Sequence, residues 1–295
     1  MKISISFCAN DFFVQHLAVA IASFVKNNPS SELIFHVLHH DIAPNHQDVL
    51  AEWGRRNDCE IRFHKVDATP FRMFPTPTAT VTREMYYRYL LPSVLTDEER
   101  TIYFDVDVVC VGDIRPLWTA NLGENILGAV IDSPLSSDKK KRLGLTGSSP
   151  YFNSGMLVMD LARMRRENAS DSLLANTARY ANCVAWPDQD VINITFHDRI
   201  QTLSSIWNNR DSYSPFNRHT IIWHFAGITS KPWCYIWKNR TWPIYLKYLL
   251  RTPFRNEAGH FIWQHVKGFF WFEYTKKKVT RTLCCGLLVR KRKSS

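Results

Sequence analysis

The sequence predicts an α/β protein with an open, mostly parallel, twisted sheet flanked by helices, and three observations support this class. Strand-like apolar runs alternate with amphipathic helix-like runs from the N-terminus onward, at the spacing of βαβ units. Residues 60–67 alternate between apolar and polar with a period of two, as a half-buried strand does. The 295 residues, 45% hydrophobic and 22% charged, suffice for a large core.

The first elements follow from this alternation and from the residues that end them. Strands are expected at 3–8, 32–41 and 60–67, and helices at 15–28 and 45–56. Pro29 stops the first helix, because proline cannot continue a helix beyond its first turn. Parallel strands joined by helices align their carboxyl ends at one edge, where open α/β sheets bind ligands.

The remaining elements are less regular. A Pro- and Thr-rich loop is expected at 69–82, a helix at 83–95, strands at 101–114 and 124–134, a mobile Lys-rich segment at 136–150, a strand running into a helix at 151–168, a helix at 188–196 and a strand closing the sheet at 220–227. From about residue 231 the pattern changes to aromatic-rich helix and basic tail. We therefore divide the chain into a main domain, 1–233, and a C-terminal part, 234–295.

Most of the net charge of +10 belongs to the tail, because residues 275–295 hold eight Lys and Arg and no acidic residue, leaving about +2 for the rest. Aromatic residues beside this charge favour attachment to an anionic membrane surface through residues 260–295. The alternative interpretation is a surface helix followed by a run of charged residues that are simply exposed to solvent. Nucleic-acid binding is not expected, because the near-neutral body has no matching basic patch.

The expected location is the cytoplasm, peripherally on the inner face of the cytoplasmic membrane. The longest apolar run, 16–25, is too short to span a bilayer, and the N-terminus lacks the apolar stretch and cleavage site of a secretory signal. The seven cysteines are scattered and contain no C-x-x-C pair, which suits reduced thiols.

Two carboxylates, Asp105 and Asp107, interrupt the apolar run at 101–114. Residues two apart in a strand face the same side, so both side chains point into one crevice near the carboxyl end of that strand. Burying both is unfavourable unless a cation lies between them. Carboxylate oxygens suit Mg²⁺ or Mn²⁺, which usually also binds phosphate oxygens. The same spacing recurs at Asp188 and Asp190, so D-x-D alone does not identify a metal site.

Five ordered segments give the chain its resemblance to a known family. They are FCANDFFVQHLAVAIAS (7–23), MYYRYLLP (85–92), IYFDVDVVCVGDI (102–114), YFNSGMLVMDL (151–161) with DQDVIN (188–193), and WHFAGITSKPW (223–233). Together they resemble the glycosyltransferases of family 8, which are retaining hexosyltransferases of the GT-A fold and include bacterial lipopolysaccharide galactosyl- and glucosyltransferases. The resemblance implies a nucleotide-sugar-binding catalytic domain at 1–233, a UDP-hexose donor carrying galactose or glucose, and a lipopolysaccharide or lipooligosaccharide core acceptor.

The resemblance also implies roles for individual residues. Asp105, Asp107 and His224 would bind Mn²⁺ or Mg²⁺, and Gly227 and Lys231 would meet the diphosphate, for which a close-approach backbone and an ammonium are suited. The whole donor site would comprise Cys8, Ala9, Asn10, Arg88, Asp105, Val106, Asp107, Asn153, Ser154, Asp188, Gln189, His224, Gly227 and Lys231.

The chain departs from the family pattern at three places. Asn10 stands where many members have an acidic residue that reads the uracil base, and Phe12 stands where some have an Asn. Lys231 lies one residue further from Gly227 than in the closest pattern. Asn can still hydrogen-bond a pyrimidine edge, so uridine remains the expected base.

Gln189 and Asp190 are the catalytic candidates. By resemblance Gln189 lies beneath the anomeric carbon, where an amide is too poor a nucleophile for the carboxylate mechanism of retaining glycosidases. A front-face mechanism would instead have the departing phosphate oxygen deprotonate the acceptor hydroxyl. Asp190 is a possible nucleophile for a double displacement, and the sequence leaves both mechanisms open.

Two other classes of protein fit part of the sequence. A haloacid-dehalogenase-type phosphatase also uses an apolar strand that ends in D-x-D, although its motif normally lies near the N-terminus. A membrane-binding scaffold with a degenerate fold would have no need of intact Asp105, Asp107 and His224. A metal-dependent glycosyltransferase accounts for more of the sequence than either.

Overall fold

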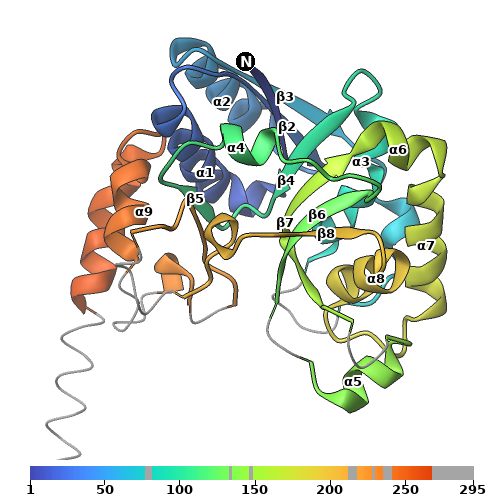
Figure 1. The fold of residues 1–295 in the computed structure, drawn as a ribbon. Helices are drawn as coiled ribbons and strands as arrows, with labels where there is room; N and C mark the ends of the chain where they lie inside the picture. The colour runs from blue at the N-terminus through green and yellow to red at the C-terminus, as the bar shows by residue number, and fades with distance from the viewer. Residues whose placement is uncertain are drawn as a thin grey trace, which may run out of the picture.

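A seven-stranded sheet forms the centre of the fold, in the strand order β3-β2-β1-β4-β7-β6-β8 (Figure 1). Its strands are β1 (Lys2–Cys8), β2 (Glu32–His39), β3 (Cys59–Lys65), β4 (Arg100–Phe104), β6 (Leu127–Ile131), β7 (Phe152–Asp160) and β8 (Ile200–Leu203). Of these seven, β7 alone runs opposite to the others, antiparallel to both β4 and β6. The computed structural model describes residues 1–76, 82–132, 135–145, 149–211, 218–227, 230–234 and 241–267. The predicted open, mostly parallel sheet is confirmed.

Alternate residues of the central strands pack on opposite faces of the sheet. In β4, Ile102 and Phe104 join the core beneath α1 and α2, whereas Tyr103 joins the core on the other face. The first face is covered by α1 (Val14–Asn27), α2 (Pro44–Arg56) and α4 (Arg115–Trp118). The second is covered by η3 (Arg83–Leu90), α3 (Leu91–Val94), α6 (Leu161–Arg166), α7 (Ala169–Arg179) and α8 (Pro187–Phe196). Helices on both faces are the layering expected of a doubly covered α/β sheet.

The fourth strand ends earlier than predicted, and this takes the paired aspartates out of the main sheet. β4 stops at Phe104, the chain turns through Asp105 and Asp107, and β5 (Val108–Cys110) pairs antiparallel with β9 (Ile222–His224) in a separate two-stranded sheet. The prediction that 220–227 closes the main sheet is therefore wrong. A continuous strand would hold both carboxylates among apolar neighbours, whereas the turn directs them toward polar and basic side chains.

Other local predictions also differ from the structure. Residues 83–95 form a 3-10 helix, η3, followed by the single turn of α3, in place of one α-helix. The segment 136–150 begins with a short helix, α5 (Ser137–Arg142), whose first turn is capped by Ser136 Oγ accepting from Lys139 N at 3.3 Å. Helix α7 and strand β8 were not predicted.

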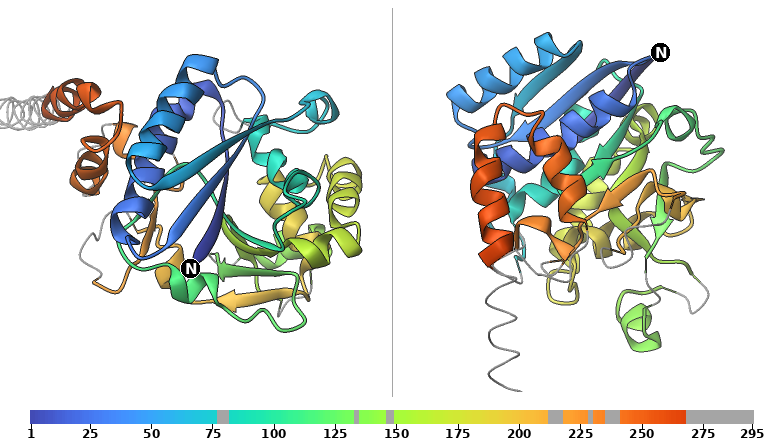
Figure 2. Two further views of the ribbon diagram at one scale, coloured as in Figure 1. Left: turned by 90° about the horizontal axis from the view of Figure 1, so that it is seen from above. Right: turned by 90° about the vertical axis from the view of Figure 1, so that its left-hand side faces the viewer.

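The C-terminal part of the described chain packs against the main domain. Helix α9 (Trp242–Leu249) and a helical segment at 258–267 lie side by side against α1 (Figure 2). Tyr248 Oη accepts a hydrogen bond from Asn27 Nδ2 of α1 at 2.8 Å. The basic tail at 275–295 lies outside the described residues. Within those residues, no helix is both long enough and apolar enough to cross a membrane.

A buried histidine in β2 predicts how stability depends on pH. His36 lies between strands β1 and β3, and its Nδ1 is 3.1 Å from His64 Nε2, while Glu98 lies 3.8 Å from its Nε2. Burial, reinforced by His64 and Arg62, lowers the pKa of His36 from 6.5 to about 3. The folded state therefore resists a proton that the unfolded chain accepts below pH 6.5.

We expect the free energy of unfolding to fall as the pH drops through 6.5 toward 3, by about 2 kcal/mol at pH 5 for His36 alone. Urea unfolding at pH 7.5 and pH 5 measures this loss. His36→Phe should remove that part of the pH dependence, whereas His260→Phe, at an exposed position, should leave it unchanged. An unaltered pH dependence in His36→Phe would contradict the assignment.

Candidate functional site

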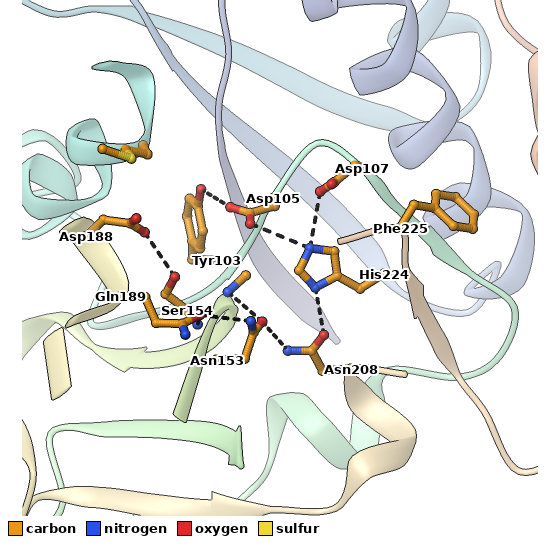
Figure 3. Close-up of polar contacts among 12 residues, drawn as sticks. Tyr103, Asp105, Asp107, Asn153, Ser154, Asp188, Gln189, Asn208, His224 and Phe225 are labelled. Carbon is orange, nitrogen blue, oxygen red and sulfur yellow. Dashed lines mark hydrogen bonds and ion pairs between the residues drawn. The ribbon is translucent and has the colours of Figure 1, made fainter. Parts of the chain in front are cut away.

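Three side chains that could hold a metal ion meet where β4 ends and the two-stranded sheet begins, and they are called the metal-binding residues below (Figure 3). Asp105 directly follows β4, Asp107 directly precedes β5, and the β5–β9 ladder places His224 opposite Val108. One ligand atom from each of Asp105, Asp107 and His224 lies within 4.8 Å of the others, and this is the one such group of three within the described ranges. His224 Nε2 is 3.6 Å from Asp105 Oδ2 and 3.3 Å from Asp107 Oδ1.

The imidazole of His224 is held in one orientation by neighbouring amides. Its Nδ1 donates to Asn208 Oδ1 at 2.8 Å, and Asn208 Nδ2 in turn donates to Asn153 Oδ1 at 2.8 Å. With the proton on Nδ1, the lone pair of Nε2 points toward the two carboxylates. Two carboxylates suit Mg²⁺ or Mn²⁺, and an imidazole nitrogen favours the transition metal of the two. The residues present therefore fit a divalent cation.

Asp105 is oriented by donors on one side of its carboxylate. Its Oδ1 accepts from Tyr103 Oη at 2.8 Å and from Arg88 Nη2 at 2.9 Å, which leaves Oδ2 facing His224. Arg88 also donates to the carbonyl of Ser154 at 2.6 Å and lies 3.3 Å from Asp188 Oδ2. Arg88 is 3% exposed, so it connects Asp105, Ser154 and Asp188 from within the protein interior.

Asp107 is paired with a lysine from a distant segment. Lys231 Nζ forms an ion pair with Asp107 Oδ2 and lies 3.4 Å from the carbonyl of Phe225. Burial alone would raise the pKa of Asp107, but the positive charge of Lys231 holds that pKa well below its usual range. The carboxylate is therefore ionised, as a metal ligand must be.

Gly155 on β7 makes room for the metal-binding side chains. Its carbonyl accepts from Asp105 N at 2.9 Å, which places the strand directly beside them. A Cβ atom at this position would lie 2.2 Å from His224 Cε1 and 2.7 Å from Asp105 Oδ2. Only glycine fits here.

A second polar network joins β7 to the start of α8. Gln189 Oε1 accepts from Asn153 Nδ2 at 2.9 Å and from Ser154 N at 3.1 Å, and Gln189 Nε2 donates to Asp132 Oδ2 at 2.9 Å. Ser154 Oγ donates to Asp188 Oδ2 at 2.9 Å. Burial raises the pKa of Asp188, and the charge of Arg88 opposes that rise. This network is linked through Asn153 and Arg88 to the metal-binding residues.

Asp190 has a separate set of buried partners. Its side chain is fully buried, with Oδ1 bonded to Tyr151 Oη and lying 3.4 Å from Lys139 Nζ. Its Oδ2 accepts from the backbone N–H groups of Ala185 and Trp186 at 2.7 and 3.0 Å. The carboxylate thus has partners on both oxygens and supports the N-terminal turn of α8.

The other predicted donor-site residues are Cys8, Ala9, Asn10, Val106 and Gly227. Cys8 and Ala9 are buried at the carboxyl end of β1, and Val106 packs on the core. Asn10 Oδ1 accepts from Phe13 N at 3.3 Å and so caps η1 (Asp11–Phe13). Gly227 has a φ of 81°, a conformation that favours glycine.

Four residues of the site were missed because their signals are weak in the sequence. Tyr103 belongs to the apolar run, and Gly155 reads as part of a turn. Asp132 follows the short strand β6, and Asn208 follows a single 3-10 turn at Ser205–Trp207, each without a motif. A polar residue directly after an apolar run is the one available signal for Asp132. Its partner Arg210, which pairs with Asp132 Oδ1, has no such signal.

Comparison with known proteins agrees with this geometry. The sequence matches the model of the family described as glycosyl transferase family 8 over residues 4–237. General stress protein A of Bacillus subtilis is 26% identical, over 86% of this chain and 91% of its own length. Lipopolysaccharide 1,2-glucosyltransferase of Escherichia coli is 25% identical, over 81% of this chain and 75% of its own length. The solved galactosyltransferase LgtC, in complex with donor and acceptor sugar analogs, superposes with a TM-score of 0.77 at 25% identity, covering 85% of this chain and 96% of that one.

Proposed function

The chain belongs to glycosyl transferase family 8, and on that premise we propose that this glycosyltransferase moves galactose or glucose from a UDP-sugar to a lipopolysaccharide or lipooligosaccharide core, with retention of configuration. The observation that carries the proposal is the cluster of Asp105, Asp107 and His224 beside Lys231. These groups are arranged to receive a cation and a diphosphate together, which is the chemistry that a nucleotide-sugar donor presents.

The metal-binding residues would hold Mn²⁺ or Mg²⁺, which as a Lewis acid would neutralise charge on the departing diphosphate. Asp105 and Asp107 supply two anionic oxygens and His224 supplies Nε2, each already oriented by neighbours. Lys231 would leave Asp107 for a phosphate oxygen once the cation takes up the carboxylate charge. The protein thus provides a prepared electrostatic site for the leaving group.

The network on β7 and α8 would bind the sugar. Asn153, Ser154 and Asp188 present amide, hydroxyl and carboxylate groups of the kinds that hydrogen-bond sugar hydroxyls. Gln189 is held between Asn153 and Asp132, which fixes its amide for a place beneath the anomeric carbon. Cys8, Ala9, Asn10, Val106 and Gly227 complete the proposed donor site.

The placement of Asp190 favours the front-face mechanism over double displacement. A nucleophile needs an accessible oxygen, whereas both oxygens of Asp190 have partners and its side chain is fully buried. We therefore assign Asp190 to support of α8 and assign Gln189 to stabilisation of an oxocarbenium-like centre. The departing phosphate oxygen would accept the proton of the acceptor hydroxyl.

Asp190→Asn should lower the melting temperature yet cost less than about tenfold in kcat, because loss of a true covalent nucleophile costs orders of magnitude more. Gln189→Ala should reduce kcat more than Asp190→Asn does. Transfer rates with Mn²⁺ measure kcat for both variants. The mass of the intact protein after rapid quenching shows whether a covalent glycosyl adduct forms. A glycosyl adduct on Asp190 would establish double displacement and overturn the assignment.

Membrane attachment is proposed for the aromatic and basic segment 260–295, at the cytoplasmic face of the membrane. In its described portion, Ile262, Trp263 and Val266 are exposed, which is unusual for large apolar side chains on one short helix. Residues 234–295 would thus form the part that contacts membrane or acceptor, and 1–233 the catalytic domain. Deleting residues from 275 onward should release the protein from anionic vesicles, and a truncated protein that still sediments with them would oppose this proposal.

The decisive test of the proposed function is a screen of UDP-sugars for donor hydrolysis and transfer with Mn²⁺. Activity with UDP-galactose or UDP-glucose, abolished by chelator, supports the proposal, and the preferred sugar identifies the donor. Activity on phosphate monoesters in place of UDP-sugars would favour the phosphatase alternative. Binding of membranes without turnover of any nucleotide sugar would favour the scaffold.

A further inference from the structure

The ammonium of Lys231 lies beside a cluster of aromatic rings drawn from three segments. Trp233, two residues later, has its ring centroid 5.4 Å from Lys231 Nζ, within cation–π range. The ring of His16, on α1, stacks on Trp233 with centroids 3.7 Å apart and planes 17° apart. Tyr245, on α9, has its ring 5.4 Å from Trp233. The position of Lys231 therefore depends on α1 and α9 as well as on its own segment.

A hydrogen bond connects the two helices within this cluster. His16 Nδ1 and Tyr245 Oη are 2.6 Å apart, and both side chains are buried. Burial, with the Lys231 charge, lowers the pKa of His16 to about 3, so its ring is neutral and does not repel the ammonium. The hydrogen bond fixes the plane of the imidazole, and the stacked Trp233 ring follows that plane.

We propose that His16 and Tyr245 are positioning residues for Lys231, acting through Trp233, so that the C-terminal helix α9 sets how the ammonium meets the donor diphosphate. The proposal rests on the proposed function, in which Lys231 binds that diphosphate. It gives α9 a role in donor binding although none of its side chains belongs to the metal-binding cluster. It also offers a physical connection between the C-terminal part of the chain and the phosphate site.

Helix α9 provides a matched control. Tyr248 is also buried on α9, and its hydroxyl also bonds α1, through Asn27. Within the described residues, no ring contact or hydrogen bond joins Tyr248 to Trp233 or Lys231. Tyr245→Phe and Tyr248→Phe each remove one buried hydroxyl from the same helix. A purely structural role predicts the same consequences for both.

The experiment measures Mn²⁺-dependent UDP binding by calorimetry, the KM and kcat for the UDP-sugar, and the melting temperature. We expect Tyr245→Phe to weaken UDP binding and raise KM about three- to tenfold, the range for one lost hydrogen bond, with kcat little changed. Tyr248→Phe should leave UDP binding and KM at the wild-type values, although both variants lose similar thermal stability.

A double-mutant cycle separates an effect through Lys231 from a general loosening. Lys231→Ala should weaken UDP binding by itself, and adding Tyr245→Phe to it should cause no further loss. Equal effects of the two tyrosine variants, or full additivity of Tyr245→Phe with Lys231→Ala, would overturn the proposal. Should Tyr245→Phe fail to fold, Trp233→Phe takes its place in the same cycle. This substitution replaces the indole that faces the Lys231 ammonium with a smaller ring. A wild-type protein that binds no UDP at all would refute the proposed function itself.

Discussion

Asp107→Asn is expected to abolish sugar transfer and Mn²⁺-dependent UDP binding while leaving the fold intact. The substitution removes the negative charge of one ligand of the proposed cation, together with the ion pair that positions Lys231 before the donor binds, so it weakens both of the groups proposed to bind the diphosphate. Charge stabilisation by a bound cation contributes several kcal/mol to such reactions, which corresponds to a loss of at least about a thousandfold in kcat/KM. Lys231 can turn toward solvent, so the melting temperature should change little.

Asp105→Ala should abolish the same activity but should also destabilise the protein. Arg88 is buried, and removal of Asp105 leaves it with Asp188 as its remaining charged partner in the described structure. Breaking a buried ion pair costs about 3–5 kcal/mol, far more than the loss expected for Asp107→Asn. The two aspartates of one motif therefore differ in their structural role, and Asp107 gives the cleaner test.

The matched control for both is Asp113→Asn, which alters an exposed aspartate on the same segment that pairs only locally, with Arg115. It should retain wild-type transfer and UDP binding. The measurements are transfer rates across UDP-sugars, UDP binding with and without chelator, and circular dichroism for the fold. Full activity of the wild-type protein in excess chelator would falsify the metal assignment.

The sequence predicted that Asp105, Asp107 and His224 would lie together, but it did not predict how the backbone brings them together. Asp105, Asp107 and His224 were identified by their motifs, and the structure brings them together. The break after Phe104 was not predictable, because an apolar run with two aspartates has the same pattern whether the strand continues or turns. The pairing of β5 with β9 decides the outcome, and that pairing joins residues more than a hundred positions apart.

The supporting residues were beyond prediction for a similar reason. Asn208 and Asp132 are ordinary polar residues in the sequence, and their importance arises from the side chains that they contact in the fold. Asp190 is the reverse case in our proposal, because its motif suggested chemistry, whereas both of its carboxylate oxygens have buried partners. Motifs identify residue types suited to a reaction, and tertiary contacts decide which of them face the substrate.

Gly155→Ala is expected to inactivate the enzyme by adding a single methyl group. The new Cβ would lie 2.2 Å from His224 Cε1, far inside contact distance, so one of the two must move. His224 is held by Asn208, and Asp105, which the methyl also approaches, is held by Tyr103 and Arg88. The metal-binding atoms therefore shift, and a displacement of about 1 Å at a reacting centre can cost roughly a hundredfold in rate.

The position of the methyl group distinguishes this effect from a general penalty for alanine. Gly259→Ala, in the helical segment 258–267, meets no atom within 4 Å and should keep full activity. The apparent affinity for Mn²⁺, measured by titrating the metal in the UDP-binding assay, should fall in Gly155→Ala alone. Wild-type Mn²⁺ affinity and transfer in Gly155→Ala would mean that β7 can move away without disturbing His224 and Asp105, and that the close approach of this strand is not required for metal binding.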